Sequence, residues 1–191
     1  MIRPLLAGAA CVALLAACNQ ERSAEPIDDV QDMASAPVGE MSAATLGANT
    51  VGGYVSNAVE GDIYEIRAAD IALERTQNAQ VRELAQMIKS DHTQASESLT
   101  QMVPTAAPDV EMPDKLDERR QGLLDNLRSA PAADFNQTYI DQQIAAHNEA
   151  LTLHRGFADN TDAPRLAEHA RTVIPKLEMH LRRAEEIKAA M

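Results

Sequence analysis

Apolar and polar residues follow a helical spacing over most of the chain beyond residue 48. Apolar positions recur at intervals of three and four, which places them on one face of an α-helix. Turn and capping residues interrupt the pattern and divide it into four long segments and one short one. We predict helices over about 50–76, 79–102, 115–129, 135–160 and 163–191.

Several residues fit the expected ends of these helices. Side chains that can cap a helix N-terminus precede four of the five segments, at Asn78, Asp114, Asp134 and Asp162. Pro175 falls inside the last helix, where it removes one backbone donor and should kink the helix locally. The segments predict an all-α domain over residues 49–191, a bundle of four long helices with the short helix in a crossover.

Charged and imidazole side chains interrupt the apolar faces of these helices. In 79–102, His92 lies in the middle of the apolar stripe and Asp91 lies at its edge. In 50–76, both Asp62 and Glu65 fall on the apolar face. Because burial of an unpaired charge is costly, we expect something to neutralise at least one of these carboxylates.

The two remaining long helices each carry a histidine at a matching depth. At a rise of ~1.5 Å per residue, Glu65, His92, His147 and His180 all lie roughly 17–20 Å from one end of the bundle, if the short helix is a crossover. His154 and His169 lie away from this layer, near each other across the last hairpin, and are expected to be ordinary polar positions near a helix end.

Three imidazoles and a carboxylate form a plausible shell for one divalent transition metal, Zn²⁺, Fe²⁺ or Cu²⁺. Asp62 or Asp91 could then accept a hydrogen bond that orients a histidine. A second interpretation makes the same residues a buried hydrogen-bond network that fixes helix register in a module binding another envelope protein. A metal-dependent oxidoreductase would further need an open coordination position and an access route.

The N-terminus has the pattern of an export signal. Residues 1–17 contain Arg3, an apolar run and small residues, and are too short to span a membrane. The run "LAAC" resembles a bacterial lipobox, which implies cleavage before Cys18, lipidation of its thiol and attachment to a membrane. Asn19 after it favours the outer membrane, with the protein facing the periplasm; a soluble periplasmic protein is the alternative. Residues 18–48 are acidic, lack periodicity and predict a flexible tether.

Composition narrows the chemistry further. The chain has 29 acidic against 17 basic residues and a net charge of −12, which disfavours nucleic-acid binding. Cys11 and Cys18 are its only cysteines, so the mature domain has neither a disulfide nor a nucleophilic thiolate. No Gly-x-Ser-x-Gly elbow or phosphate-binding loop occurs. These features favour a binding protein over a general catalyst.

Four motifs in order resemble a bacterial exported family known as domain of unknown function 4142. They are "EIRAADIAL", "VRELAQMIKSDH", "DFNQTYIDQQIAAHNEAL" and "ARTVIPKLEMHLRRA", and the resemblance covers about residues 52–187. It implies a ferritin-like four-helix bundle, often in envelope proteins, without an established activity. Asn136 departs from the pattern, since an acid is expected there.

The residues themselves argue against a di-iron centre. Ferritin-like di-iron proteins carry Glu-x-x-His on two helices. In this chain Lys89 stands three residues before His92, and Leu177 three before His180. A single metal ion is therefore the most that this layer supports.

Overall fold

The computed structural model describes residues 32, 35–36 and 38–191, and this part of the chain is all-α without strands. The predicted signal segment 1–17 and Cys18 lie outside the described residues. The five α-helices are α2 (Val51–Arg75), α3 (Ala79–Ala106), α4 (Glu118–Ser129), α5 (Phe135–Phe157) and α6 (Pro164–Ala189), preceded by a π-helical turn, η1 (Ala43–Gly47). In the described residues, no helix is long and apolar enough to cross a bilayer.

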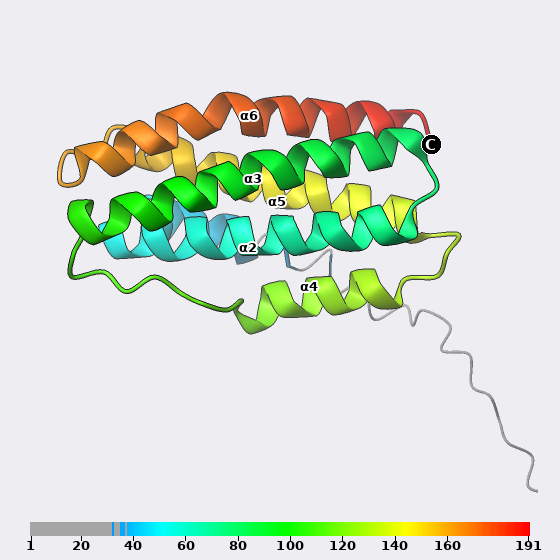
Figure 1. Cartoon of the computed structure of the whole chain (residues 1–191), viewed down its shortest axis with the longest axis horizontal. Coiled ribbons are helices and arrows are strands. Elements are labelled where there is room, and N and C mark those ends of the chain that lie inside the picture. Colours follow the sequence, from blue (N-terminus) through cyan, green and yellow to red (C-terminus); the bar gives the residue numbers. More distant parts are fainter. Residues whose placement is uncertain (1–31, 33–34, 37) are drawn as a thin grey trace, which may run out of the picture.

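The four long helices form a bundle, with the short α4 outside it (Figure 1). Helix α2 packs against α3 and α5, and α6 packs against the same two helices, while α4 lies across α2 and α5. The chain runs along α2, returns along α3, and is carried back by the connection through α4 (Figure 1). This confirms the predicted all-α bundle with a short helix in the crossover, the topology with one long connection that ferritin-like bundles use.

Side-chain bonds fix the end to which the crossover returns. The hydroxyl of Thr76, just after α2, donates to the Asn136 side chain in the first turn of α5 over 2.6 Å. The Arg75 guanidinium donates to the backbone carbonyls that end α4, at Leu127, Arg128 and Ala130. Asn136, where the family resemblance suggests an acid, thus uses its side-chain amide to connect the end of α2 to the start of α5.

The N-terminal caps differ from the sequence prediction at three helices. Helix α4 begins later than expected, because Asp117, not Asp114, caps it by accepting a hydrogen bond from the Arg120 backbone N–H over 2.6 Å. Asp134 precedes α5 without a side-chain capping bond. Before α6 the Asn160 side chain, not Asp162, accepts backbone N–H bonds from the residues that lead into the helix.

Two prolines lie inside helices. Helix α3 continues through Pro104 to Ala106, beyond the predicted end at residue 102. Val103, which is buried, gains apolar contacts by staying helical, and this outweighs one missing backbone bond near the helix end. Helix α6 runs through Pro175 as one continuous element.

The described part of the predicted tether folds onto the bundle. Helix η1 lies against α2 and α5, and Ala43 is fully buried there. Residues 43–47, which the sequence analysis assigns to the tether, thus pack against the bundle. The acidic composition of the whole segment conceals this short apolar contact.

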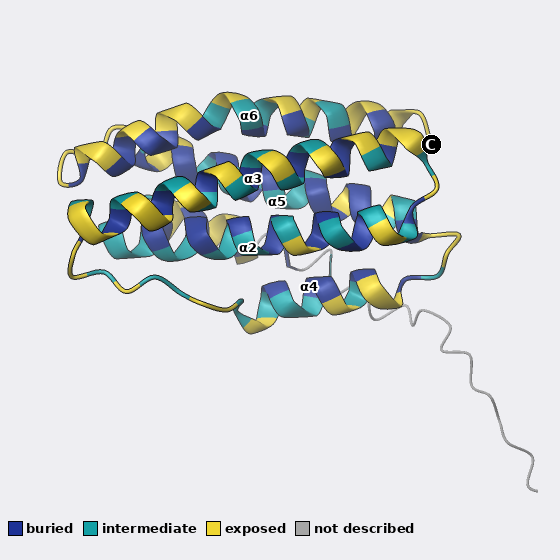
Figure 2. Ribbon diagram, in the orientation of Figure 1, coloured by how far each residue is buried: buried dark blue, intermediate teal, exposed yellow. Residues whose placement is uncertain are grey.

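The apolar core has two large parts, one at each end of the bundle. The first, around Leu84, Leu124 and Ile140, joins α2, α3, α4 and α5 near the α2–α3 turn. The second, around Tyr54, Leu99 and Phe157, lies toward the other end. Buried faces of the helices point inward throughout (Figure 2). The section between the two clusters is where the buried polar residues gather.

Candidate metal centre

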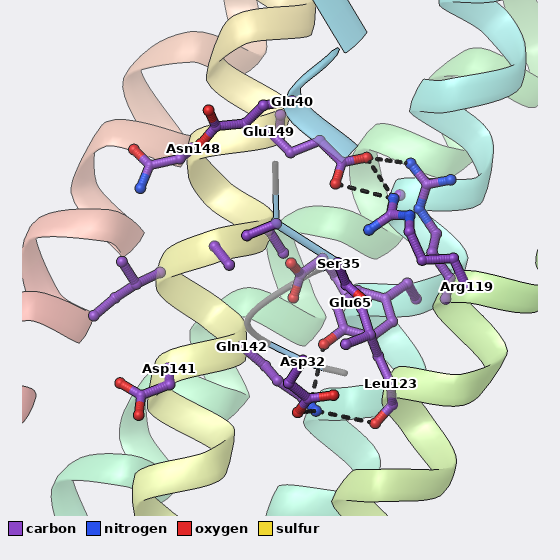
Figure 3. Close-up of a pocket in the computed structure, with 18 of the residues that line it drawn as sticks. Asp32, Ser35, Glu40, Glu65, Arg119, Leu123, Asp141, Gln142, Asn148 and Glu149 are labelled. Carbon is purple, nitrogen blue, oxygen red and sulfur yellow. Dashed lines mark hydrogen bonds and ion pairs between the residues drawn. The ribbon is translucent and has the colours of Figure 1, made fainter. Parts of the chain in front are cut away.

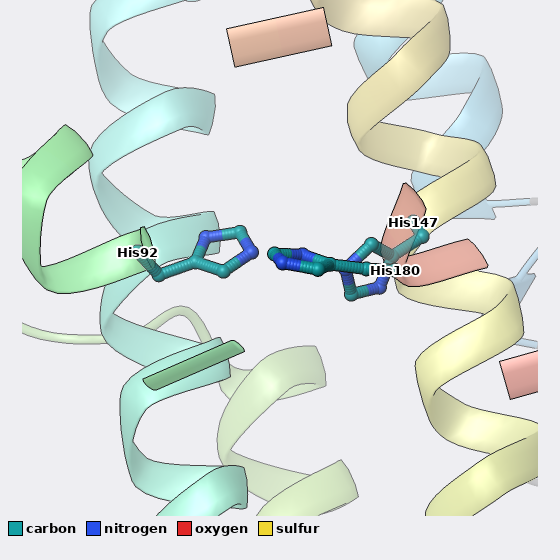
Figure 4. Close-up of side chains that lie close together, drawn as sticks. All are labelled: His92, His147 and His180. Carbon is teal, nitrogen blue, oxygen red and sulfur yellow. The ribbon is translucent and has the colours of Figure 1, made fainter. Parts of the chain in front are cut away.

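Three histidines from three helices meet in this middle section. His92 of α3, His147 of α5 and His180 of α6 each offer a nitrogen, and these nitrogens all lie within 4.8 Å of one another. The rings point toward each other (Figure 4), with centroids 5.3–5.8 Å apart. All three side chains are buried, His180 completely. The predicted convergence of these histidines is therefore present.

Each histidine uses its outer nitrogen for a partner on the protein. His92 Nδ1 lies 2.8 Å from Asp62 Oδ1, His147 Nδ1 lies 2.9 Å from the Gln143 carbonyl, and His180 Nε2 lies 3.0 Å from Asp91 Oδ2. Carbonyl and carboxylate oxygens accept hydrogen bonds, so each outer nitrogen is the donor in a neutral ring. The predicted role of Asp62 and Asp91 in orienting histidines matches these contacts.

The inner nitrogens are consequently left as acceptors. With the proton on the outer nitrogen, His92 Nε2, His147 Nε2 and His180 Nδ1 each carry a lone pair toward the centre. His147 Nε2 and His180 Nδ1 lie 3.2 Å apart, and His92 Nε2 is buried without a hydrogen-bond partner. In their neutral forms, the three imidazoles thus present acceptors to one buried point, an arrangement that a cation would stabilise.

Burial and mutual repulsion keep two of the three rings neutral. Burial lowers the pKa of His147 well below its usual 6.5, and the neighbouring His92 and His180 lower it further. Burial likewise lowers the pKa of His180 to about 4. Burial acts in the same direction on the pKa of His92, but the bond to Asp62 and the nearby carboxylates reverse it, so that this pKa is raised overall.

Glu65 stands beside the three histidines rather than among their inner nitrogens. Its Oε1 atom lies 3.6 Å from His147 Nδ1, the nitrogen that faces away from the cluster, and its Oε2 has no hydrogen-bond partner. Burial raises the pKa of Glu65 to about 7. The structure therefore brings three of the four predicted ligands together and places Glu65 next to the outer side of one of them.

Asp62, and not Glu65, is the carboxyl group of α2 that contacts His92. Asp62 is buried, and its carboxyl group accepts a hydrogen bond from His92 Nδ1. Helical spacing puts Asp62 and Glu65 on the same face, and only the packing of α2 on α3 selects between them.

Two further histidines are buried near this cluster. His154 and His169, expected to be ordinary polar positions, are 5% and 6% exposed, with ring centroids 6.2 Å apart. His154 Nδ1 lies 3.1 Å from the Tyr54 hydroxyl, whereas His169 Nε2 is buried without a partner. Their spacing in the sequence predicted the proximity, but their nearness to the ends of two helices gave no sign of burial.

Two hollows reach the site from opposite sides. A cavity of about 700 Å³ lies between α2 and α5, where Ser35, Glu40 and Glu65 line it (Figure 3). His92 also lines this cavity. A groove of about 180 Å³ lies between α3 and α6, and His92, His180 and His169 line it. The site therefore has the access that the sequence could not reveal.

The fold and site together define an all-α helical bundle with a buried cluster of three histidines. The family described as domain of unknown function (DUF4142) matches residues 33–187, and the chain belongs to that family. No curated protein and no solved structure matches the chain.

Proposed function

We propose that this protein binds one divalent transition metal through His92, His147 and His180. The observation that carries the proposal is the convergence of three imidazole lone pairs on one buried point, each ring held by an outer acceptor. Such outer partners fix the tautomer and orientation of metal-binding histidines. Zn²⁺, Fe²⁺ and Cu²⁺ all accept neutral imidazole ligands.

Three protein ligands would leave one coordination position open. Glu65, the fourth ligand that the sequence predicts, lies 3.6 Å from the outer nitrogen of His147 and would supply a compensating charge beside the site. A bound metal would supply Lewis acidity or redox chemistry at this point. The protein would hold the ion, keep His147 and His180 neutral and limit access through the two hollows.

We also propose that the protein works in the bacterial envelope, held at the outer membrane by lipid on Cys18. The lipobox resemblance supports this location, and the acidic charge supports a tether made by lipid rather than by electrostatic attraction. In that setting the bundle would serve metal handling or the response to envelope stress. A soluble periplasmic protein remains the competing location, and mass spectrometry of the membrane fraction for lipidated Cys18 separates the two.

Elemental analysis of protein purified without an affinity tag or chelator tests metal binding. We expect about one equivalent of a single metal in the wild type after exposure to Zn²⁺, Cu²⁺ or anaerobic Fe²⁺. The H92A variant should retain none. His154→Gln is the matched control, because it alters a buried histidine outside the cluster and should leave the metal content unchanged.

The competing interpretation is a metal-free polar network that sets helix register. It expects H92A to destabilise the fold while the wild type shows no metal dependence. A wild-type protein that takes up none of the three ions would remove the metal proposal and favour the network.

A further inference from the structure

The groove between α3 and α6 contains a histidine nitrogen that the three-histidine cluster does not use. His169 is 6% exposed, and its Nε2 atom is buried without a hydrogen-bond partner. The same groove is lined by His92 and His180, two of the three proposed ligands. A buried imidazole nitrogen without a partner is costly unless a ligand, an ion or water satisfies it.

The groove also has a polar rim connected to the cluster. Lys176 of α6 reaches across to α3, where its Nζ atom lies 2.8 Å from Asp91 Oδ1 and 3.1 Å from Gln94 Oε1. The other oxygen of Asp91 accepts from His180. The Asp91 carboxylate on the rim therefore contacts the proposed ligand His180 through one oxygen and the Lys176 ammonium group through the other.

The larger cavity carries charged groups of both signs and is the alternative route that the experiment below tests. It meets the cluster through His92 and Glu65, and its walls include carboxylates as well as the Arg119 and Arg120 guanidinium groups. These arginines are bound to Glu149, with the shortest contact, between Arg120 and Glu149, at 2.6 Å. His154 also lines this cavity, and its Nδ1 lies 3.1 Å from the Tyr54 hydroxyl.

We propose that a divalent cation reaches the cluster through the α3–α6 groove, and that His169 is the ligand that receives it before His92 and His180. This inference rests on the proposed metal-binding function and adds a route and a transient ligand to it. An imidazole lone pair inside the groove would replace part of the hydration shell that the ion loses on leaving water. The ion would then pass to three ligands, which hold it more firmly than one.

Stopped-flow absorption of Co²⁺ binding to the full chain measures the route directly. His169→Gln should slow uptake roughly tenfold, equivalent to about 1.4 kcal/mol of activation free energy, without changing the final stoichiometry. Ser98→Leu adds a large side chain to the α3 wall of the same groove and should also slow uptake. Because there are two groove variants, one of them still tests the route if the other does not fold.

Gly61→Leu is the matched control in the opposite cavity. Gly61 lines that cavity, and a Cβ atom added there meets nothing within 4 Å. The side chain should therefore obstruct the cavity without a clash and leave the Co²⁺ uptake rate unchanged. Slowing by Gly61→Leu alone, or unchanged rates in both groove variants, would overturn the route while leaving metal binding intact. A wild-type chain with no Co²⁺ bound at equilibrium would overturn both proposals.

Discussion

His147 Nε2 and His180 Nδ1 face each other over 3.2 Å although the outer partner of each ring leaves the inner nitrogen without a proton. Two acceptors at hydrogen-bond distance repel unless something positive lies between or beside them. A proton on one ring would satisfy the pair, but burial lowers the pKa of both histidines. This contact is therefore where a metal and a proton compete.

Metal binding should raise thermal stability through this contact. An ion at about 100 times its Kd adds about 2.7 kcal/mol to folding, which for a chain of this size corresponds to a rise in Tm of roughly 5–10 °C. His180→Gln should abolish the rise. Differential scanning calorimetry with and without Zn²⁺ measures it, and an equal rise in wild type and variant would place the ion elsewhere.

Asp91 should tune metal affinity without binding the ion. Asp91→Asn keeps an oxygen for the His180 N–H but removes the charge that makes the ring a stronger ligand, so the Kd should rise about 10–100-fold. Lys176→Met is the control, because it removes the other partner of Asp91 and leaves the bond to His180. Competition titration with a chromophoric chelator gives both constants. A Kd unaltered in Asp91→Asn would show that this carboxylate has no such role.

The metal-free protein should lose stability as the pH falls below about 6.5. Burial lowers the pKa of His154 to about 3 and that of His169 and His180 to about 4. Below 6.5 the unfolded chain takes up protons that the folded chain refuses, so acid favours unfolding. Burial raises the pKa of Glu65 to about 7, and the pKa values of Glu60, Asp62 and His92 are also raised. These groups act oppositely and lose their contribution to stability as the pH rises.

Urea unfolding at pH 4.5, 6.0 and 7.5 in the presence of EDTA measures this balance. The large decreases in the pKa values of His147, His154, His169 and His180 outweigh these opposing shifts, so the free energy of unfolding should be smallest at pH 4.5. His154→Gln retains a partner for the Tyr54 hydroxyl while removing one titrating group. The free energy of unfolding should therefore decrease less between pH 7.5 and pH 4.5 in this variant. An equal slope in the two proteins would mean that His154 takes up its proton in the folded state.

The connection through α4 should depend on one buried guanidinium group. Arg120 pairs with Glu60 of α2 and Glu149 of α5, at 3.2 Å and 2.6 Å. Arg120→Met leaves these carboxylates short of a partner and should cost about 3 kcal/mol of stability. Arg128→Met removes a surface pair with Asp125 and should cost less than about 1 kcal/mol. Denaturant unfolding compares the two.

A double variant checks the cause of that loss. Arg120→Met combined with Glu149→Gln removes the uncompensated charge, and it should recover part of the stability lost in the single variant. Additive losses would instead point to the apolar stem of Arg120 as the source of its contribution.

The helices were predictable because their information is local. The spacing of apolar residues and the cap at Asn78 act within a few residues, so the five helices appear in the sequence with errors only at their ends. The start of α4 was missed because Asp114 and Asp117 are equally good caps by residue type. The choice depends on Arg120, whose guanidinium group must reach two other helices.

The sequence by itself determined that His92, His147 and His180 face the core at one depth, because helical period and rise fix both direction and height. Only the tertiary structure decided what each ring contacts. Side chains on one face compete for the same partner, and the relative rotation and separation of packed helices, which are long-range properties, settle the competition. That is why Asp62 rather than Glu65 holds His92, and why His169 lies buried in a groove that no local pattern marks.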